Sequence, residues 1–248
     1  MLDFLKDHPF TVEAFFDSSL VVTFAVNARS LGALIPNCLS IDELRGHGFI
    51  AVAMVQTRGL RPAGWPRLFG QDFFLIGYRV FVRFQTDGGR SMRGLYILRS
   101  ATNKRRMQYS GNLFTRYSYR TVDVTQGAIG DVRTINSLDS NLHIRYRQPS
   151  GPAIGLPANS PFENLQEARK FAGPLPYTFT VEKTENRVLV IEGVRRNWRP
   201  EAVQIVDANV GFLDEIGFPD AQLANAFLVT NIPYRWEKGR FQKCPKPS

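Results

Sequence analysis

The sequence predicts a mainly β protein with a few short helices, built as one closed or nearly closed antiparallel structure. Segments rich in β-branched and aromatic residues recur along the chain, and several of them are joined by short turns. Only short helical segments separate them. The 248 residues are 44% hydrophobic and include 19 Phe, which is enough to build a sizeable core. We expect a single domain spanning residues 1–248, because the Pro- and Gly-rich stretch 151–158 does not separate two different compositions.

The longest predicted strand, residues 73–85, alternates clearly. Its even positions are all apolar or aromatic: Phe74, Ile76, Tyr78, Val80, Val82 and Phe84. Its odd positions include Arg79 and Arg83. Because successive side chains of a strand point to opposite faces, this strand has one core face and one mixed face.

The other elements follow from turn and capping signals. Asn27 is a helix cap for residues 28–34, and Asp87-Gly88-Gly89 closes a hairpin. Ser160-Pro161 predicts the start of a helix that runs to about residue 170. The remaining strands are expected at 19–26, 49–56, 91–99, 114–124, 130–136, 142–147, 177–182, 187–193 and 202–207, with a short helix at 210–216 and a weak strand after 231.

Composition limits the function classes. The chain has 31 basic and 22 acidic residues, a formal net charge of +9, which favours anionic partners. The cations are spread along the chain without interleaved aromatic residues, so nucleic acid is not the expected partner. No run reaches the roughly 18 to 20 apolar residues of a membrane span. The N-terminal residues lack the pattern of a signal peptide, so we expect a cytoplasmic protein.

Cysteine and histidine usage predicts neither a metal site nor a cofactor. Cys38 and Cys244 lie far apart and form no metal or redox motif. The three histidines are not in ligand spacing with one another or with a cysteine.

The stretch 90–111 (RSMRGLYILRSATNKRRMQYSG) is the strongest candidate site. It predicts a strand that runs into a short helix, with Lys104, Arg105 and Arg106 at the junction. Strand ends followed by helix starts often carry functional groups, because backbone donors and charged side chains meet there.

Several segments together resemble a known family. They are SSLVVTFAVNARSLGALIPNCLSI, GFIAVAMVQTRGLRPAGWPRL, GLYILRSATNKRRM and YTFTVEKTENRVLVIEGVRRNWRPEAVQIVDANV. They look like the YqjF-like bacterial family of unknown function (domain of unknown function 2071). The resemblance implies the acetoacetate decarboxylase-like fold, an antiparallel β-barrel or double sheet that encloses a pocket.

The resemblance also implies a catalytic hypothesis. In acetoacetate decarboxylase a lysine followed by a second lysine forms a Schiff base with a β-keto acid. Lys104 matches the first lysine by position and Arg105 the second, which keeps the positive charge. The decarboxylase has a glutamate just before its lysine pair, and Leu98-Arg99-Ser100 contains none.

Three functions therefore stay open. The first is a protein that binds a small organic ligand such as a carboxylate, with Arg79, Arg99 and Arg105 as candidate binding residues. For Arg79 and Arg99 the alternative is that they point to solvent. The second is a Schiff-base enzyme that uses Lys104 on a keto acid or aldehyde. The third is a basic interaction protein, and self-association is compatible with all three. An apolar cavity with Lys104 on the surface would favour the first, and a buried Lys104 beside a cavity the second.

Overall fold

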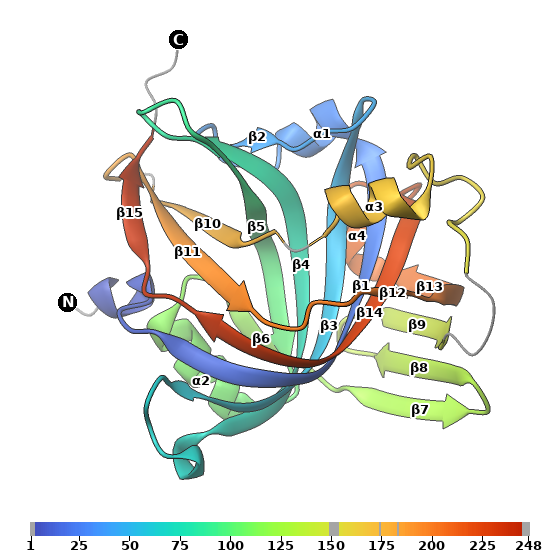
Figure 1. Ribbon diagram of the computed structural model, residues 1–248, viewed down its shortest axis with the longest axis horizontal. Helices are drawn as coiled ribbons and strands as arrows, with labels where there is room; N and C mark the ends of the chain where they lie inside the picture. The colour runs from blue at the N-terminus through green and yellow to red at the C-terminus, as the bar shows by residue number, and fades with distance from the viewer. Residues whose placement is uncertain (1–2, 149–153, 174, 183, 245–248) are drawn as a thin grey trace.

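The computed structural model describes residues 3–148, 154–173, 175–182 and 184–244. Most of these residues lie in two β-sheets, and the described α-helices have ten residues or fewer. Figure 1 shows a large, strongly curved sheet with a small sheet beside it. The prediction of a mainly β protein with short helices is confirmed.

The large sheet curls until its ends meet. Its path runs through β12 (Glu201–Ala202), β14 (Gln222–Trp236), β1 (Val12–Asn27), β3 (His47–Pro62), β4 (Gln71–Gln85), β5 (Ser91–Thr102), β10 (Tyr177–Glu182), β11 (Arg187–Arg195) and β15 (Arg240–Lys243). Two short strands join it at the sides, β2 (Ser40–Ile41) on β4 and β6 (Tyr119–Thr121) on β5. β11 also pairs with β14, where Arg195 lies opposite Tyr234, so the path closes on itself. The expectation of antiparallel pairing holds except at β5, which pairs in parallel with β10 and β6.

The small sheet has the order β13 (Gln204–Val210), β9 (Leu142–Arg147), β8 (Val132–Ser137) and β7 (Thr125–Ile129). β8 and β9 form the hairpin predicted from the sequence. Figure 1 shows this sheet to the right of the large sheet.

The helices are short and lie at the ends of strands. They are η1 (Asp3–Asp7), α1 (Ala28–Gly32), η2 (Arg67–Phe69), α2 (Arg105–Phe114), α3 (Leu165–Phe171) and α4 (Gly211–Glu215). The predicted cap of α1 is confirmed, because the Asn27 side chain accepts a hydrogen bond from the Ser30 backbone N–H at 3.0 Å.

Two expectations about elements were wrong. α3 begins after Asn164 rather than at Ser160, whose hydroxyl instead donates to the Ala224 carbonyl at 2.7 Å. The strand expected at 114–124 shrinks to β6, because α2 continues through Phe114. The weak strand expected after 231 is confirmed as β15, whereas residues 231–236 continue β14, a long strand that contains Pro233. The predicted linker at 151–158 lies partly outside the described residues.

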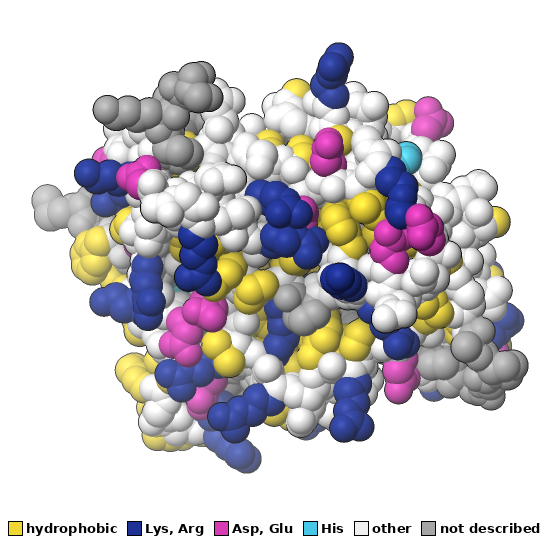
Figure 2. Space-filling model, turned by 45° about the horizontal axis from the view of Figure 1, so that its top comes forward, with side chains coloured by type: hydrophobic (Ala, Val, Ile, Leu, Met, Phe, Trp, Pro, Cys, Tyr) yellow, Lys and Arg dark blue, Asp and Glu magenta, His cyan; other side chains and the backbone are white. Residues whose placement is uncertain are grey.

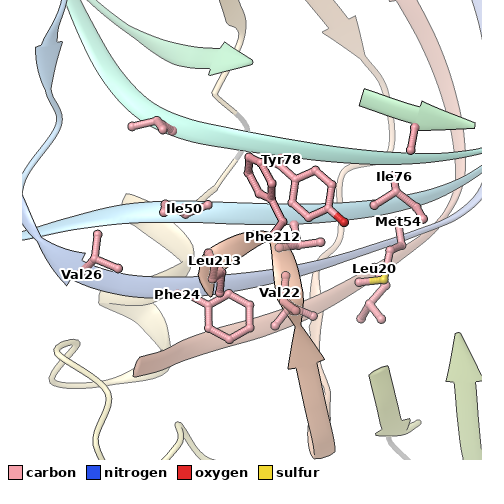
Figure 3. Close-up of a cluster of buried hydrophobic side chains, with 14 of the residues drawn as sticks. Leu20, Val22, Phe24, Val26, Ile50, Met54, Ile76, Tyr78, Phe212 and Leu213 are labelled. Atoms are coloured by element: carbon pink, nitrogen blue, oxygen red, sulfur yellow. The ribbon is translucent and has the colours of Figure 1, made fainter. Parts of the chain in front are cut away.

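The two faces of β4 have the different roles that its alternation predicts. Its even positions are buried in a core cluster shared with β1, β3, the small sheet and α4. Figure 3 shows part of this cluster, in which the Tyr78 ring packs against Phe212 with a centroid distance of 4.4 Å. The odd positions Phe73, Leu75, Arg79 and Phe81 lie on the opposite face and line a cavity.

A disulfide bond joins Cys38, in the loop after α1, to Cys244 at the end of β15. Their Cα atoms are 5.4 Å apart, although 206 positions separate them in the sequence. The sequence contained no motif for this pair, because only the fold brings these distant segments together. The bond therefore links β15 covalently to the loop that follows α1.

Candidate ligand-binding cavity

A cavity of about 220 Å³ lies on the inner face of the large sheet. Its walls come from β1, β3, β4, β5 and α2, and most of the lining side chains are apolar. The space exists because two strands present small residues there: Ala51 and Ala53 on β3, and Ser19 on β1. Bulkier residues at these positions would fill the interior to the density usual for protein cores.

Arg79 places a guanidinium group in this apolar cavity. It lies on β4 between Ala51 of β3 and Ile97 of β5. The guanidinium folds over Gly77, and a Cβ at that glycine would lie 2.9 Å from Arg79 Nε. Arg79 makes no hydrogen bond or ion pair with any described residue, and its Nε is buried. The absence of a side chain at Gly77 therefore leaves room for a cation that no described residue neutralises.

Arg195 brings a second guanidinium to the cavity from the end of β11. One of its N–H groups donates to the Leu175 carbonyl at 2.7 Å. Its guanidinium carbon lies 4.7 Å from the ring centroid of Trp198 and 5.6 Å from that of Tyr234. Burial lowers the pKa of Arg195, and the positive charge of Arg79 lowers it further. An arginine remains charged despite such a shift.

Buried polar atoms without a hydrogen-bond partner gather at this cavity. Nine described residues carry such an atom, and five of the nine line the cavity. These five are His8 Nδ1, Thr57 Oγ1, Arg79 Nε, Tyr117 Oη and Trp198 Nε1. Buried polar groups in native proteins are almost always bonded, so these atoms require hydrogen-bond partners from water or from a molecule bound in the cavity.

The tyrosines of this region are donors at neutral pH. Burial raises the pKa of Tyr119 to about 12 and raises that of Tyr117 still more. Both phenols are therefore protonated. Together with the indole of Trp198 and the two guanidinium groups, they make the cavity rich in donors, and no described Asp or Glu lines it.

Of the four residues singled out from the sequence, only Arg79 lines the cavity. Lys104 is the residue before α2, and its side chain is exposed, as is that of Arg105. Arg99 lies on the other side of the sheet, where it pairs with Glu215 at 2.5 Å and stacks over Phe212 at 4.3 Å.

A β-bulge explains why Arg79 and Arg99 face opposite sides. Tyr78 pairs with Arg99, whereas the next residue, Arg79, pairs with Ile97, so Leu98 is an extra residue in β5. An extra residue in one strand reverses the face of the sheet to which the following side chains of that strand point. Arg99 therefore points to the Tyr78 side of the sheet, away from the cavity.

Arg195, Trp198 and His8 line the cavity but were not predicted from the sequence. Arg195 shares the strand face of Leu189 and Ile191, which are buried in a core cluster. This shared strand face was the one indication in the sequence that Arg195 points inward. Trp198 and His8 lie outside regular strands, where no periodicity indicates the direction of a side chain.

The excess positive charge is not gathered into a single patch on the face drawn in Figure 2. Lys and Arg side chains lie there singly or in small groups, interspersed with Asp and Glu. Within the described residues, no group of three His, Cys, Asp or Glu side chains is placed to hold a metal ion. None of the helices in the described part of the chain has the length and apolar character of a membrane span.

Solved structures with the same fold include an acetoacetate decarboxylase, an acetoacetate decarboxylase-like enzyme and an enduracididine biosynthesis enzyme. Acetoacetate decarboxylase from Legionella pneumophila aligns over 94% of this chain and 87% of its own, with 8% identity and a TM-score of 0.63. An acetoacetate decarboxylase-like enzyme from Sphingomonas wittichii aligns over 97% and 96%, with 13% identity and a TM-score of 0.59. The enduracididine biosynthesis enzyme MppR, complexed with pyruvate, aligns over 95% and 91%, with 9% identity and a TM-score of 0.55. At these identities the likeness shows the fold.

The sequence itself has one informative match. Comparison with curated proteins finds none. The model of the DUF2071 family, described as an uncharacterised conserved protein (COG2071), matches residues 14–235. The chain therefore belongs to the DUF2071 family and has the acetoacetate decarboxylase-like fold.

Proposed function

We propose that the protein binds a small organic anion, such as a carboxylate, in this cavity. The carboxylate lies against Arg79 and Arg195, and its apolar body packs against the wall formed by residues such as Phe16 and Leu75. The observation that carries the proposal is the presence of two guanidinium groups in an apolar cavity without an acidic partner among the described residues. Guanidinium groups bind carboxylates with two parallel hydrogen bonds, which gives both affinity and orientation.

The energetic argument supports this function over a structural role. A buried cation is costly unless an anion and hydrogen bonds compensate it. Arg61 lines the same cavity but is compensated, since it pairs with Glu13 at 2.5 Å and donates to the Gly59 carbonyl at 2.9 Å. Arg79 and Arg195 have no such acid in the part of the chain that the structure describes. A bound anion would neutralise the charges of these two arginines and so stabilise the folded protein.

The size of the cavity supports a small ligand. An apolar cavity of about 150 Å³ accommodates benzene, so about 220 Å³ has room for one ring and an acidic group. Pyruvate, the ligand of the MppR complex, is also a small carboxylate, and that protein has the same fold.

Benzoate is the probe that we choose for the first test. We expect isothermal titration calorimetry to show binding of benzoate to the unmodified protein. Hydrogen bonds to charged groups are worth about 2 kcal/mol, so Arg195→Met should weaken binding by about 30-fold.

Arg99→Met is the matched control. It removes an arginine that stacks on an aromatic ring, as Arg195 does, but outside the cavity. The control should bind benzoate as the unmodified protein does. Equal losses in both variants would contradict the proposal.

The Schiff-base enzyme is the second candidate, and the fold shared with acetoacetate decarboxylase favours it. The exposed position of Lys104 argues for the ligand-binding function instead. Intact-mass spectrometry after incubation with pyruvate and borohydride separates the two. One adduct that is absent from Lys104→Ala would make the enzyme the leading proposal.

The cytoplasmic location expected from the sequence is also part of this proposal, and the disulfide provides its test. Glutathione and thioredoxin keep most cytosolic thiols reduced, whereas disulfides persist in oxidising compartments. In cells that are acid-quenched and alkylated at once, we therefore expect Cys38 and Cys244 to be labelled, with the bond forming later in air. Protein that takes up no label would come from an oxidising compartment.

A further inference from the structure

The positive charges that remain uncompensated in the cavity can be counted. Four residues with basic side chains line it: His8, Arg61, Arg79 and Arg195. Glu13 compensates Arg61. His8 is neutral near pH 7, because burial lowers its pKa to about 4. Two positive charges, on Arg79 and Arg195, remain without an acid among the described residues.

These two charges belong to one cluster. Arg79 projects from β4 and Arg195 from β11, and both side chains line the same cavity. Tyr234 pairs with Arg195 across β14 and β11, with its ring 5.6 Å from the guanidinium carbon, and Tyr117 lines the same cavity. One ligand headgroup in this cluster would therefore interact with both arginines.

The donors also outnumber the acceptors of a single carboxylate. Each guanidinium has five N–H groups, and a carboxylate offers about four lone-pair sites. Only one N–H of the pair is bonded to a described residue, the one that donates to the Leu175 carbonyl. The Tyr117 hydroxyl and the Trp198 indole N–H add two more unbonded donors. A monoanion would leave one buried charge and several donors without a partner, and both are costly.

We infer that the natural ligand carries two negative charges in a headgroup that binds Arg79 and Arg195 together, attached to a small apolar body. Both a phosphate monoester and a dicarboxylate have this chemistry. This inference rests on the proposed function, since it specifies the anion that the same cavity binds.

Three probes with the same ring test the charge: benzoate as a monoanion, and phthalate and phenyl phosphate as dianions. At about pH 8 we expect both dianions to bind at least tenfold more tightly than benzoate. The second pKa of a phosphate monoester is about 6, so phenyl phosphate should lose about five- to tenfold in affinity at about pH 5. The relative affinities of phthalate and phenyl phosphate tell the two chemistries apart.

Variants show whether both charges are needed. Arg79→Met and Arg195→Met should each reduce the dianion preference to about one. Arg195→Lys keeps the charge without the planar fork and should retain most of the preference. Arg99→Met should leave it unchanged. Circular dichroism confirms that each variant is folded.

The two proposals fail in different ways. Benzoate binding that equals or exceeds that of both dianions would overturn the inference and leave the proposed function standing. If none of the three probes binds the unmodified protein, both proposals are wrong.

Discussion

Removal of the Cys38–Cys244 disulfide is expected to lower the free energy of unfolding by about 5 kcal/mol. In the chain-entropy account a disulfide stabilises by restricting the unfolded chain, and the effect grows with the length of the closed loop. This bond closes a loop of 206 residues, which places it at the upper end of the range. We also propose that residues 1–248 form one domain, so the loss should shift one cooperative transition downward by roughly 10 °C or more.

The measurement compares Cys38→Ala/Cys244→Ala with the oxidised protein in thermal and urea unfolding. Dithiothreitol should lower the melting temperature of the oxidised protein to that of the double variant, and it should not affect the variant itself. A variant that melts within 2 °C of the oxidised protein, or that melts in two steps, would disagree with this account.

Replacement of His8 by asparagine is expected to remove part of the acid sensitivity of the protein. His8 is only 6% exposed, and burial lowers its pKa from 6.5 to about 4. Between these two values the unfolded chain binds a proton that the folded protein does not, so stability is lost as the pH falls. The full loss is about 3 kcal/mol, of which about 2 kcal/mol is reached by pH 5.

Asparagine suits this position because the backbone of His8 has a φ of 54°, a conformation that asparagine adopts more readily than most residues. Urea unfolding at pH 7 and at pH 5 should show a loss for the unmodified protein that exceeds the loss for His8→Asn by about 2 kcal/mol. The carboxylates titrate in both proteins and cancel in this difference. Parallel pH profiles would show that His8 does not have the lowered pKa.

The fold was predicted well where one residue or one alternation determines local structure. The alternation of β4 correctly divided Tyr78 from Arg79, one facing the core cluster and the other the mixed face. Asn27 correctly marked the start of α1. These features depend on neighbours within a few positions, which the sequence displays directly.

The site was only partly predictable, because long-range pairing determines it. Arg99 would share the cavity with Arg79 if the strands paired regularly, but the extra residue Leu98 turns it to the other side. Arg195 reaches the cavity only because β11 meets β14 at the closing seam of the sheet. Bulges and seams leave no periodic signal in one sequence.

The unbonded donors in the cavity have a practical consequence for finding the natural ligand. A molecule that binds only the folded state stabilises it by about 2.7 kcal/mol at one hundred times its dissociation constant. For a chain of this length that amounts to a rise in melting temperature of roughly 5 to 10 °C. The cavity brings together Arg79, Arg195, Tyr117 and Trp198 with few partners of their own, so the empty protein should respond strongly to whatever supplies acceptors. Fractionated cell extracts can therefore be screened by melting temperature alone, with no assay of activity and no assumption about chemistry.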